Sequence, residues 1–222
     1  MRPSTIVRTA VLAGAAAGAY VRWARPWYLG WGATDEELQR PLPGDDLIPT
    51  PDLVATRAIT VRAPADRVWP WIAQLGQGRG GLYSYDALEN LIGCDMHSAD
   101  RILAECQDVA AGDEFKLHPE VALRVAAVEP PRSLVVRGGV PMADTRPPYD
   151  FTWSFVLLEA QSGTARLLVR ERYRYTRWWS PLLVEPVEAL SFLMSRKMLR
   201  GLRDRAERAE RQEPSARKER KV

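Results

Sequence analysis

The chain has 222 residues, of which 46% are hydrophobic, and its formal net charge is +3. This length suits one large domain or one domain with appendages, and a mean hydropathy of −0.27 argues against a protein with many membrane spans. Residues 196–222 hold eleven Lys or Arg and five Asp or Glu, a net +6, so the rest of the chain carries −3. The basic character therefore belongs to a tail, and the sequence predicts no nucleic-acid-binding face.

Residues 1–31 form an N-terminal hydrophobic and aromatic segment that allows three interpretations. Thr9 to Val21 is uncharged, but its 13 residues span about 20 Å as a helix, less than the roughly 30 Å hydrocarbon core of a bilayer. A signal peptide with a small-residue site at Ala17-Gly18-Ala19 is one interpretation. A small-residue helix packed on the domain is another. We favour a membrane-associated helix because aromatic and basic side chains follow, which suit the bilayer interface: Arg22, Trp23, Arg25, Trp27, Tyr28 and Trp31.

The chain contains two cysteines, Cys94 and Cys106, too few for a disulfide framework. They indicate thiols in a reducing compartment, so we expect a cytoplasmic protein. The N-terminal segment would attach this protein to a membrane surface. Residues 32–54 are expected to hold a short helix and a linker. Thr34-Asp35-Glu36-Glu37 predicts a capping box, and the proline-rich stretch from Pro41 to Pro51 predicts extended chain.

A strand, two short helices and a glycine hinge open the main domain, residues 55–211. Ala58 to Arg62 alternates as a half-buried strand does, and Val68 to Leu75 has helical spacing. Gly76 to Gly81 matches G-x-G-x-x-G, but a helix rather than a strand precedes it, so we interpret it as a tight reversal and not as a dinucleotide site. Tyr83 to Gly93 predicts a second helix with Ser84 as its cap. Its apolar face would consist of Leu88, Leu91 and Ile92.

Further strands and one long helix complete the pattern. Strands are predicted at 114–117, 121–128, 133–137, 149–159 and 165–175, and a short helix near 99–104. Ser180-Pro181 begins a last helix whose apolar stripe is Leu183, Val187, Leu190, Met194, Met198 and Leu202. Gly138 to Pro148 is a candidate lid over a cavity. Residues 212–222 predict a disordered charged tail.

The stretch from Gly76 to Gly93 reads G-Q-G-R-G-G-x-Y-S-Y-D-x-L-E-N-L-x-G, and Asp95 and Ser98-Ala99-Asp100-Arg101-Ile102 follow it. This motif resembles the SRPBCC superfamily, and more narrowly an uncharacterised actinobacterial-type branch labelled polyketide cyclase/dehydrase-like. The resemblance covers about residues 55–211. It implies an α+β helix-grip (START-like) fold, in which a curved antiparallel sheet surrounds a long C-terminal helix over an apolar cavity. Superfamily members bind lipids, sterols, polyketides and similar molecules, and some are enzymes.

Polar side chains of the motif and of the last strand are the candidate ligand-binding residues, because a carboxylate or histidine in an apolar cavity has a shifted pKa and can act as acid or base. The candidates are Tyr83, Tyr85, Asp86, Glu89, Asp95, His97, Arg170 and Arg172, with Tyr173 beside them. The alternative is that Tyr83 and Tyr85 pack, Asp86 and Glu89 face water, and Arg101 pairs with a nearby carboxylate.

Cys94, Asp95, His97 and Cys106 do not form a recognisable zinc spacing, so the sequence predicts neither a metal nor a cofactor. We expect a protein that binds a hydrophobic small molecule such as a lipid, quinone or polyketide. The second hypothesis is a cyclase- or dehydratase-like enzyme that uses Asp95, His97 or a tyrosine of the motif for proton transfer. The third is a membrane-tethered interaction domain with a filled core and no ligand.

Overall fold

The computed structural model describes residues 12, 15, 18–139, 147–160 and 163–219, and side chains up to Arg211. The helices are α2 (Arg25–Leu29), α3 (Asp35–Gln39), α4 (Ala65–Ala73), α5 (Asp86–Leu91) and α6 (Ser180–Glu219). The strands are β1 (Leu53–Val61), β2 (Glu114–His118), β3 (Val121–Glu129), β4 (Ser133–Gly138), β5 (Tyr149–Ala160) and β6 (Thr164–Tyr175). Short helical turns lie at Tyr20–Ala24, Asp45–Leu47 and Ala104–Cys106.

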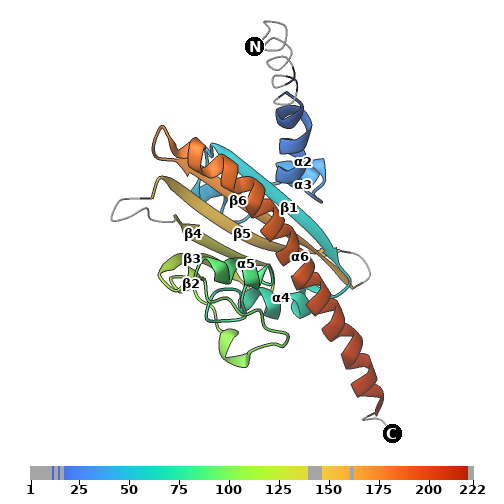
Figure 1. The fold of residues 1–222 in the computed structure, drawn as a ribbon. Helices are drawn as coiled ribbons and strands as arrows, with labels where there is room; N and C mark the ends of the chain where they lie inside the picture. The colour runs from blue at the N-terminus through green and yellow to red at the C-terminus, as the bar shows by residue number, and fades with distance from the viewer. Residues whose placement is uncertain (1–11, 13–14, 16–17, 140–146, 161–162, 220–222) are drawn as a thin grey trace, which may run out of the picture.

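The six strands form one antiparallel sheet in the order β1-β6-β5-β4-β3-β2, so the first strand pairs with the last. The sheet curves, and α6 crosses its inner face diagonally (Figure 1). This is the helix-grip fold that the sequence predicted. The strands from β2 to β6 begin and end within one residue of the predicted bounds, because turn residues separate runs that alternate clearly.

The two halves of α6 have different environments. Around the middle of the helix, Met198 and Leu202 are 2% and 0% exposed and belong to the main core with Phe155 and Val169 of the sheet. In the N-terminal half, the stripe residue Val187 is half exposed. The predicted stripe is therefore core only from Met198 onward, because its residues before Met198 lie over a cavity.

The segment between α4 and α5 is a tight reversal, as predicted. The backbone N–H groups of Gly76 and Gly81 each donate to the other residue's carbonyl, at 3.0 and 3.1 Å. A Cβ atom on Gly81 would lie 2.8 Å from the carbonyl oxygen of His97, and its φ is +75°, so this position requires glycine. The side chain of Gln74 then joins the reversal to the next loop, because Nε2 donates to Tyr83 Oη and Oε1 accepts from the N–H of Leu103.

Helix α5 differs from its prediction in both its cap and its orientation. Ser84 does not cap it, because its hydroxyl donates to the carbonyl of Met194 on α6 at 3.2 Å. The three residues predicted to be its apolar face, Leu88, Leu91 and Ile92, are 52%, 82% and 73% exposed. Glu89 is the residue of α5 that faces the interior. The predicted helix near 99–104 is also wrong, since only a short helical turn at Ala104–Cys106 forms there.

Residues 30–50 cover the outer face of the sheet. The predicted capping box is confirmed, because Thr34 Oγ1 accepts from the N–H of Glu37 and the Glu37 carboxylate accepts from the N–H of Thr34. The proline-rich linker is not simply extended. It folds into the turn at Asp45–Leu47, and Leu42 packs in a second core cluster with Ala58, Val156 and Leu168.

Three predictions fall wholly or partly outside the described residues. Most of Thr9 to Val21 is one, and the central part of the candidate lid, residues 140–146, is another. The charged tail is the third. The backbone of α6 is helical to Glu219, which differs from the predicted irregular tail, and the alternation of Ala, Glu and Arg in residues 205–211 favours helix there.

Candidate functional site

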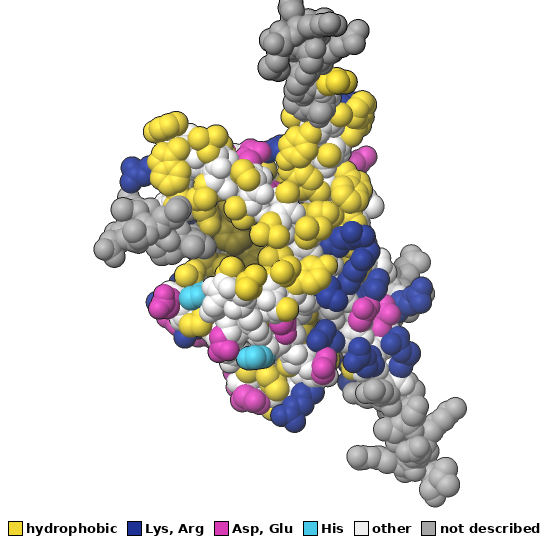
Figure 2. All heavy atoms as spheres, viewed as in Figure 1, with side chains coloured by type: hydrophobic (Ala, Val, Ile, Leu, Met, Phe, Trp, Pro, Cys, Tyr) yellow, Lys and Arg dark blue, Asp and Glu magenta, His cyan; other side chains and the backbone are white. Residues whose placement is uncertain are grey.

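A cavity of about 240 Å³ lies between the inner face of the sheet and the N-terminal half of α6. Figure 2 shows an apolar hollow on this face of the molecule. Its wall comes from the segment between α4 and α5, from α5, from strands β2, β3, β5 and β6, and from α6. The lining residues are Leu82, Ser84, Glu89, Leu117, Leu123, Tyr149, Phe151, Trp153, Glu171, Tyr173, Val187, Leu190, Ser191, Met194, Ser195 and Met198.

Aromatic side chains of β5 and β6 form a large part of this wall because their positions alternate toward the inner face of the sheet. Tyr149, Phe151 and Trp153 follow one another at every second residue of β5. Tyr173 of β6 packs on two of them, with ring centroids 5.6 Å from Tyr149 and 4.7 Å from Phe151. Such a wall suits an apolar molecule, whose burial removes apolar surface from water.

Glu171 supplies one polar part of the wall, and every oxygen of its carboxylate has partners. Oε1 accepts from Arg57 Nη1 at 2.9 Å and from Ser195 Oγ at 3.0 Å, while Oε2 accepts from Ser191 Oγ at 3.1 Å and from Tyr173 Oη at 3.2 Å. This carboxylate is thus anchored by both a strand and α6, which fixes the helix over the cavity.

Arg57 pairs with a second buried acid behind Glu171. Its guanidinium donates through Nη2 to Glu188 of α6 and through Nε to the carbonyl oxygen of Tyr28. Burial, and then the charge of Glu171, raise the pKa of Glu188 to about 8. One guanidinium therefore donates hydrogen bonds to two carboxyl groups, and this cluster joins β1, β6 and α6 in the interior.

Glu89 supplies the other polar part of the wall, and its environment is different. Its side chain is 3% exposed, and neither carboxylate oxygen has a hydrogen-bond partner among the described residues. Burial, together with the charge of nearby Asp86, raises its pKa to about 7. Trp153 Nε1 on the same wall also has no partner within the described part of the chain. Buried polar groups of this kind mark places where a ligand can bind.

Of the candidates on the motif, Glu89 alone lines the cavity. Tyr83 is 1% exposed, and burial raises the pKa of its hydroxyl, which accepts from Gln74 Nε2 at 2.8 Å. Tyr85 is 42% exposed and lies under the ammonium of Lys197, 5.9 Å from the ring centroid. Asp86 accepts from the N–H and the hydroxyl of Ser98, both at 2.7 Å, and so holds the loop after α5.

Asp95 and His97 lie at the surface. Their side chains are 71% and 80% exposed, and His97 Nε2 lies 3.2 Å from Asp95 Oδ1. No cluster of three or more metal-ligating side chains occurs within the described residues. Cys94 and Cys106 are both free and buried.

Arg170 and Arg172 project from the outer face of the sheet and do not line the cavity. Arg170 binds the carbonyl oxygens of residues 37, 38 and 40 and Asp45 Oδ2, the last at 2.7 Å. Arg172 binds Asp45 Oδ1 at 3.1 Å and the carbonyl oxygen of Ile48. They differ from the expectation because residues of a strand alternate between faces, so they flank Glu171 and Tyr173 on the other side.

The sequence analysis did not identify Arg57, Glu171 and Glu188, although the strand period could have found two of them. Arg57 has the same parity as Ile59 and Val61 in β1, and Glu171 has the same parity as Leu167 and Val169 in β6, so both belong to the buried face. A charged side chain at such a position indicates a buried partner. Glu188 gives no comparable signal, because it is one of several polar residues that lie between the apolar residues of α6.

Comparisons with known proteins reveal similarity at the level of fold. No family model and no curated protein matches the chain. The aromatase/cyclase Zhui of Streptomyces sp. R1128 is 18% identical over 70% of this chain and 94% of that one, with a TM-score of 0.44. The hypothetical protein jhp0584 of Helicobacter pylori is 12% identical over 75% and 95%, with a TM-score of 0.46. CalU16 of Micromonospora echinospora is 19% identical over 69% and 83%, with a TM-score of 0.35.

Proposed function

We propose that this helix-grip protein binds a hydrophobic small molecule in the cavity between its sheet and α6. The observation that carries the proposal is the cavity itself, about 240 Å³ with an aromatic wall, where a domain with a purely structural role would have packed side chains. Binding would remove apolar ligand surface from water, with a gain of about 25 cal/mol per Å². Glu89, Trp153 and the hydroxyl groups near Glu171 would orient the ligand.

Native mass spectrometry of the full chain, purified without detergent, tests this proposal. We expect a mass above that of the polypeptide, and solvent extraction should release a lipid-, quinone- or polyketide-like molecule. If the protein is empty, a panel of hydrophobic compounds should raise its melting temperature. If the protein is empty and none of these compounds changes its melting temperature, the result would support the third hypothesis, an interaction domain that binds no ligand.

An enzyme that transfers a proton to or from the bound molecule is the second candidate. It is favoured by one observation, that Glu89 lines the cavity with a pKa near 7, where a carboxyl group serves best as acid or base at neutral pH. In this version Glu89 takes the role that the sequence suggested for Asp95 or His97, which are exposed. Incubation of the extracted molecule with the protein should give a product, and Glu89→Gln should abolish product formation while ligand is still bound.

A membrane surface is the proposed partner, and exposed apolar side chains support it. Trp23, Trp27 and Trp178 are 67%, 58% and 87% exposed, and Figure 2 shows hydrophobic side chains over this face from the N-terminal helices to the hollow. Tryptophans favour the bilayer interface. Among the described helices, none is long and apolar enough to span a membrane. The proposal is a cytoplasmic protein that contacts the membrane surface.

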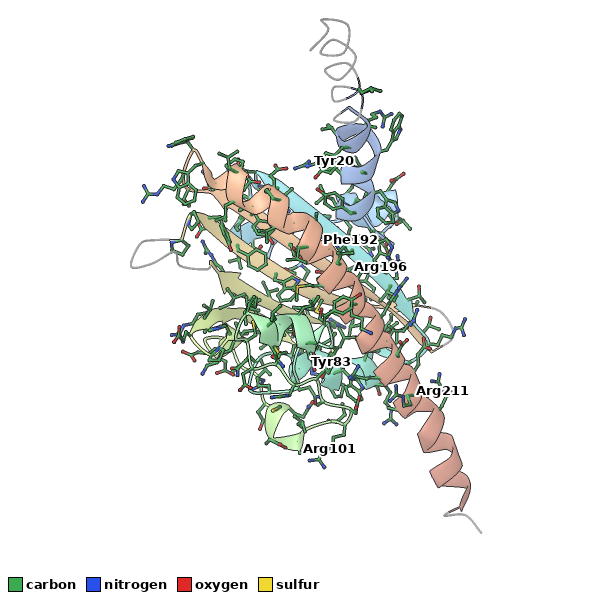
Figure 3. The ribbon with its side chains drawn as sticks, viewed as in Figure 1. Tyr20, Tyr83, Arg101, Phe192, Arg196 and Arg211 are labelled. Atoms are coloured by element: carbon green, nitrogen blue, oxygen red, sulfur yellow. The ribbon has the colours of Figure 1, made fainter. Side chains whose placement is uncertain are left out.

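The N-terminal helices are attached to the same face of the domain. Figure 3 shows Phe192 of α6 near these helices. Trp27 of α2 packs edge-on against Phe192, with ring centroids 5.2 Å apart, and Arg25 forms an ion pair with Glu185 at 3.0 Å. Co-sedimentation with vesicles of phosphatidylcholine and phosphatidylglycerol tests the contact. We expect the wild type to sediment with the vesicles and a Trp23→Ser, Trp27→Ser variant to remain in solution. Equal sedimentation of both would contradict this role.

A further inference from the structure

The unpartnered carboxyl group of Glu89 and the charge balance of the cavity together restrict the chemistry of the ligand. Two acidic side chains line the cavity, Glu89 and Glu171, and the described lining contains no Lys, Arg or His. Glu171 is matched by Arg57 and three hydroxyl groups, so it needs nothing from a ligand. Glu89 has no such partners within the described residues, so a ligand could supply the hydrogen-bond donors that its carboxyl group lacks.

The groups around Glu89 do not provide a compensating positive charge. Asp86 lies three residues before it on α5, and its charge disfavours a second carboxylate. Cys94 on the following loop is close enough that burial and then Glu89 raise the pKa of its thiol. The facing wall from β5, β6 and α6 contributes one charged group, Glu171, which already has Arg57 as its partner. The rest of that wall consists of aromatic rings, serines and nonpolar side chains. An anionic ligand would therefore lie beside Glu89 and Glu171, with no cationic side chain in the described lining to bind it.

The aromatic wall of the cavity favours a cationic ligand. Tyr149, Phe151, Trp153 and Tyr173 present rings to the cavity, and the negative faces of aromatic rings attract cations. A cationic group in this cavity would thus gain from the rings and from the Glu89 carboxylate together, and each of these interactions is stronger where water is excluded.

We infer that the ligand is an apolar molecule that carries a basic nitrogen, whose N–H groups donate to Glu89. This inference rests on the proposed function and names the class of ligand. The ligand would bind as an ammonium ion to the Glu89 carboxylate, so one proton is held by the nitrogen and none by the carboxyl group. Trp153 Nε1 can donate to an oxygen atom of the same ligand where one is present.

Isothermal titration calorimetry on the full chain with three probes of equal chain length tests the inference: decylamine, decan-1-ol and decanoate. We expect decylamine to bind about tenfold more tightly than decan-1-ol at pH 8, and decanoate to bind more weakly than either. Glu89→Gln should reduce the affinity for decylamine to the level of decan-1-ol and change the affinity for decan-1-ol by less than about twofold. The matched control is Glu120→Gln, which removes one acid from an exposed turn and should leave all three affinities unchanged.

The pH dependence adds an independent measurement. Because Glu89 must be ionised to bind the ammonium group, affinity for decylamine should fall about tenfold from pH 8 to pH 6 in the wild type, and should not fall in Glu89→Gln. Affinity for decan-1-ol should be flat in both proteins.

The possible results separate the two claims. Equal affinity of the wild type for decylamine and decan-1-ol, a preference for decylamine that survives in Glu89→Gln, or tight binding of decanoate would overturn the inference and leave hydrophobic binding intact. Failure of all three probes to bind would contradict the proposed function as well.

Discussion

Arg57 on β1 donates to Glu171 on β6 across 2.9 Å, and both side chains are at most 3% exposed. The same guanidinium pairs with Glu188 of α6, so one cation is the partner of acidic side chains from two elements. Breaking this cluster from its centre should therefore be costly. We expect Arg57→Met to lower the free energy of unfolding by about 3–5 kcal/mol, because it leaves two buried carboxyl groups without their cation.

Chemical denaturation measures this change. Arg132→Met is the matched control, since Arg132 pairs with Glu129 at the surface, where both side chains are more than half exposed. Such surface pairs contribute about 0–1 kcal/mol. A loss in Arg57→Met no larger than in Arg132→Met would show that the buried cluster does not hold α6 on the sheet.

The stability of the protein should depend on Glu89 and pH. The folded-state pKa of about 7 lies above the ordinary value of 4.5, so the folded state binds the proton more tightly and its stability falls as pH rises between these values. Glu89→Gln removes this contribution. Relative to the wild type it should gain about 2–3 kcal/mol of unfolding free energy between pH 5 and pH 8. Parallel stability curves for the two proteins would contradict the burial of an unpaired carboxyl group.

Gly201 lies where α6 crosses the segment after the glycine reversal. A Cβ atom there would lie 2.5 Å from the carbonyl oxygen of Tyr83. Gly→Ala in a helix normally stabilises by about 1 kcal/mol. At this position we expect Gly201→Ala to destabilise by about 1–3 kcal/mol, because the helix must move away from Tyr83. Thermal unfolding shows whether Gly201→Ala stabilises or destabilises the protein. The control is Ala189→Gly at an exposed position of α6, which measures the effect of helix propensity alone. A stabilised Gly201→Ala protein would refute the close contact.

Arg170 should hold residues 37–45 against the outer face of the sheet, because one guanidinium binds three backbone carbonyl groups and Asp45. Arg170→Met should make this segment the first site of limited proteolysis, with cleavage mapped by mass spectrometry. Arg174→Met is the control, since Arg174 is exposed and binds Thr50 alone among the described contacts. Equal cleavage rates in the two variants would contradict a specific role for Arg170.

The sequence predicted the fold well where periodicity and turns agree. Strands β2 to β6, the start of α6 at Ser180 and the glycine reversal all follow from local chemistry that tertiary packing does not override. The resemblance of the stretch from Gly76 to Gly93 to a known superfamily indicated the arrangement of these elements around α6.

The candidate site was harder to predict, because it depends on which face of an element turns inward. The apolar residues of α5 predicted that Leu88, Leu91 and Ile92 are buried. The structure orients this short helix through Tyr83, whose φ is +55°, and through the bonds from Ser98 to Asp86, and the apolar side chains remain outside. Glu89 faces inward as a consequence. No helical period contains that information, because tertiary contacts at both ends of six residues determine the rotation.

The most direct test of the account is whether the cavity between the sheet and α6 is where a hydrophobic molecule binds. Val187 lines this cavity and is 53% exposed, so Val187→Trp can fill the space without disturbing the core. Leu193 is 49% exposed on the same helix and is outside the lining, so Leu193→Trp is its matched control. Calorimetry with decan-1-ol should show binding to the wild type and to Leu193→Trp, and an affinity lower by about tenfold or more in Val187→Trp. Equal affinity in all three proteins would place the binding site elsewhere and contradict the account.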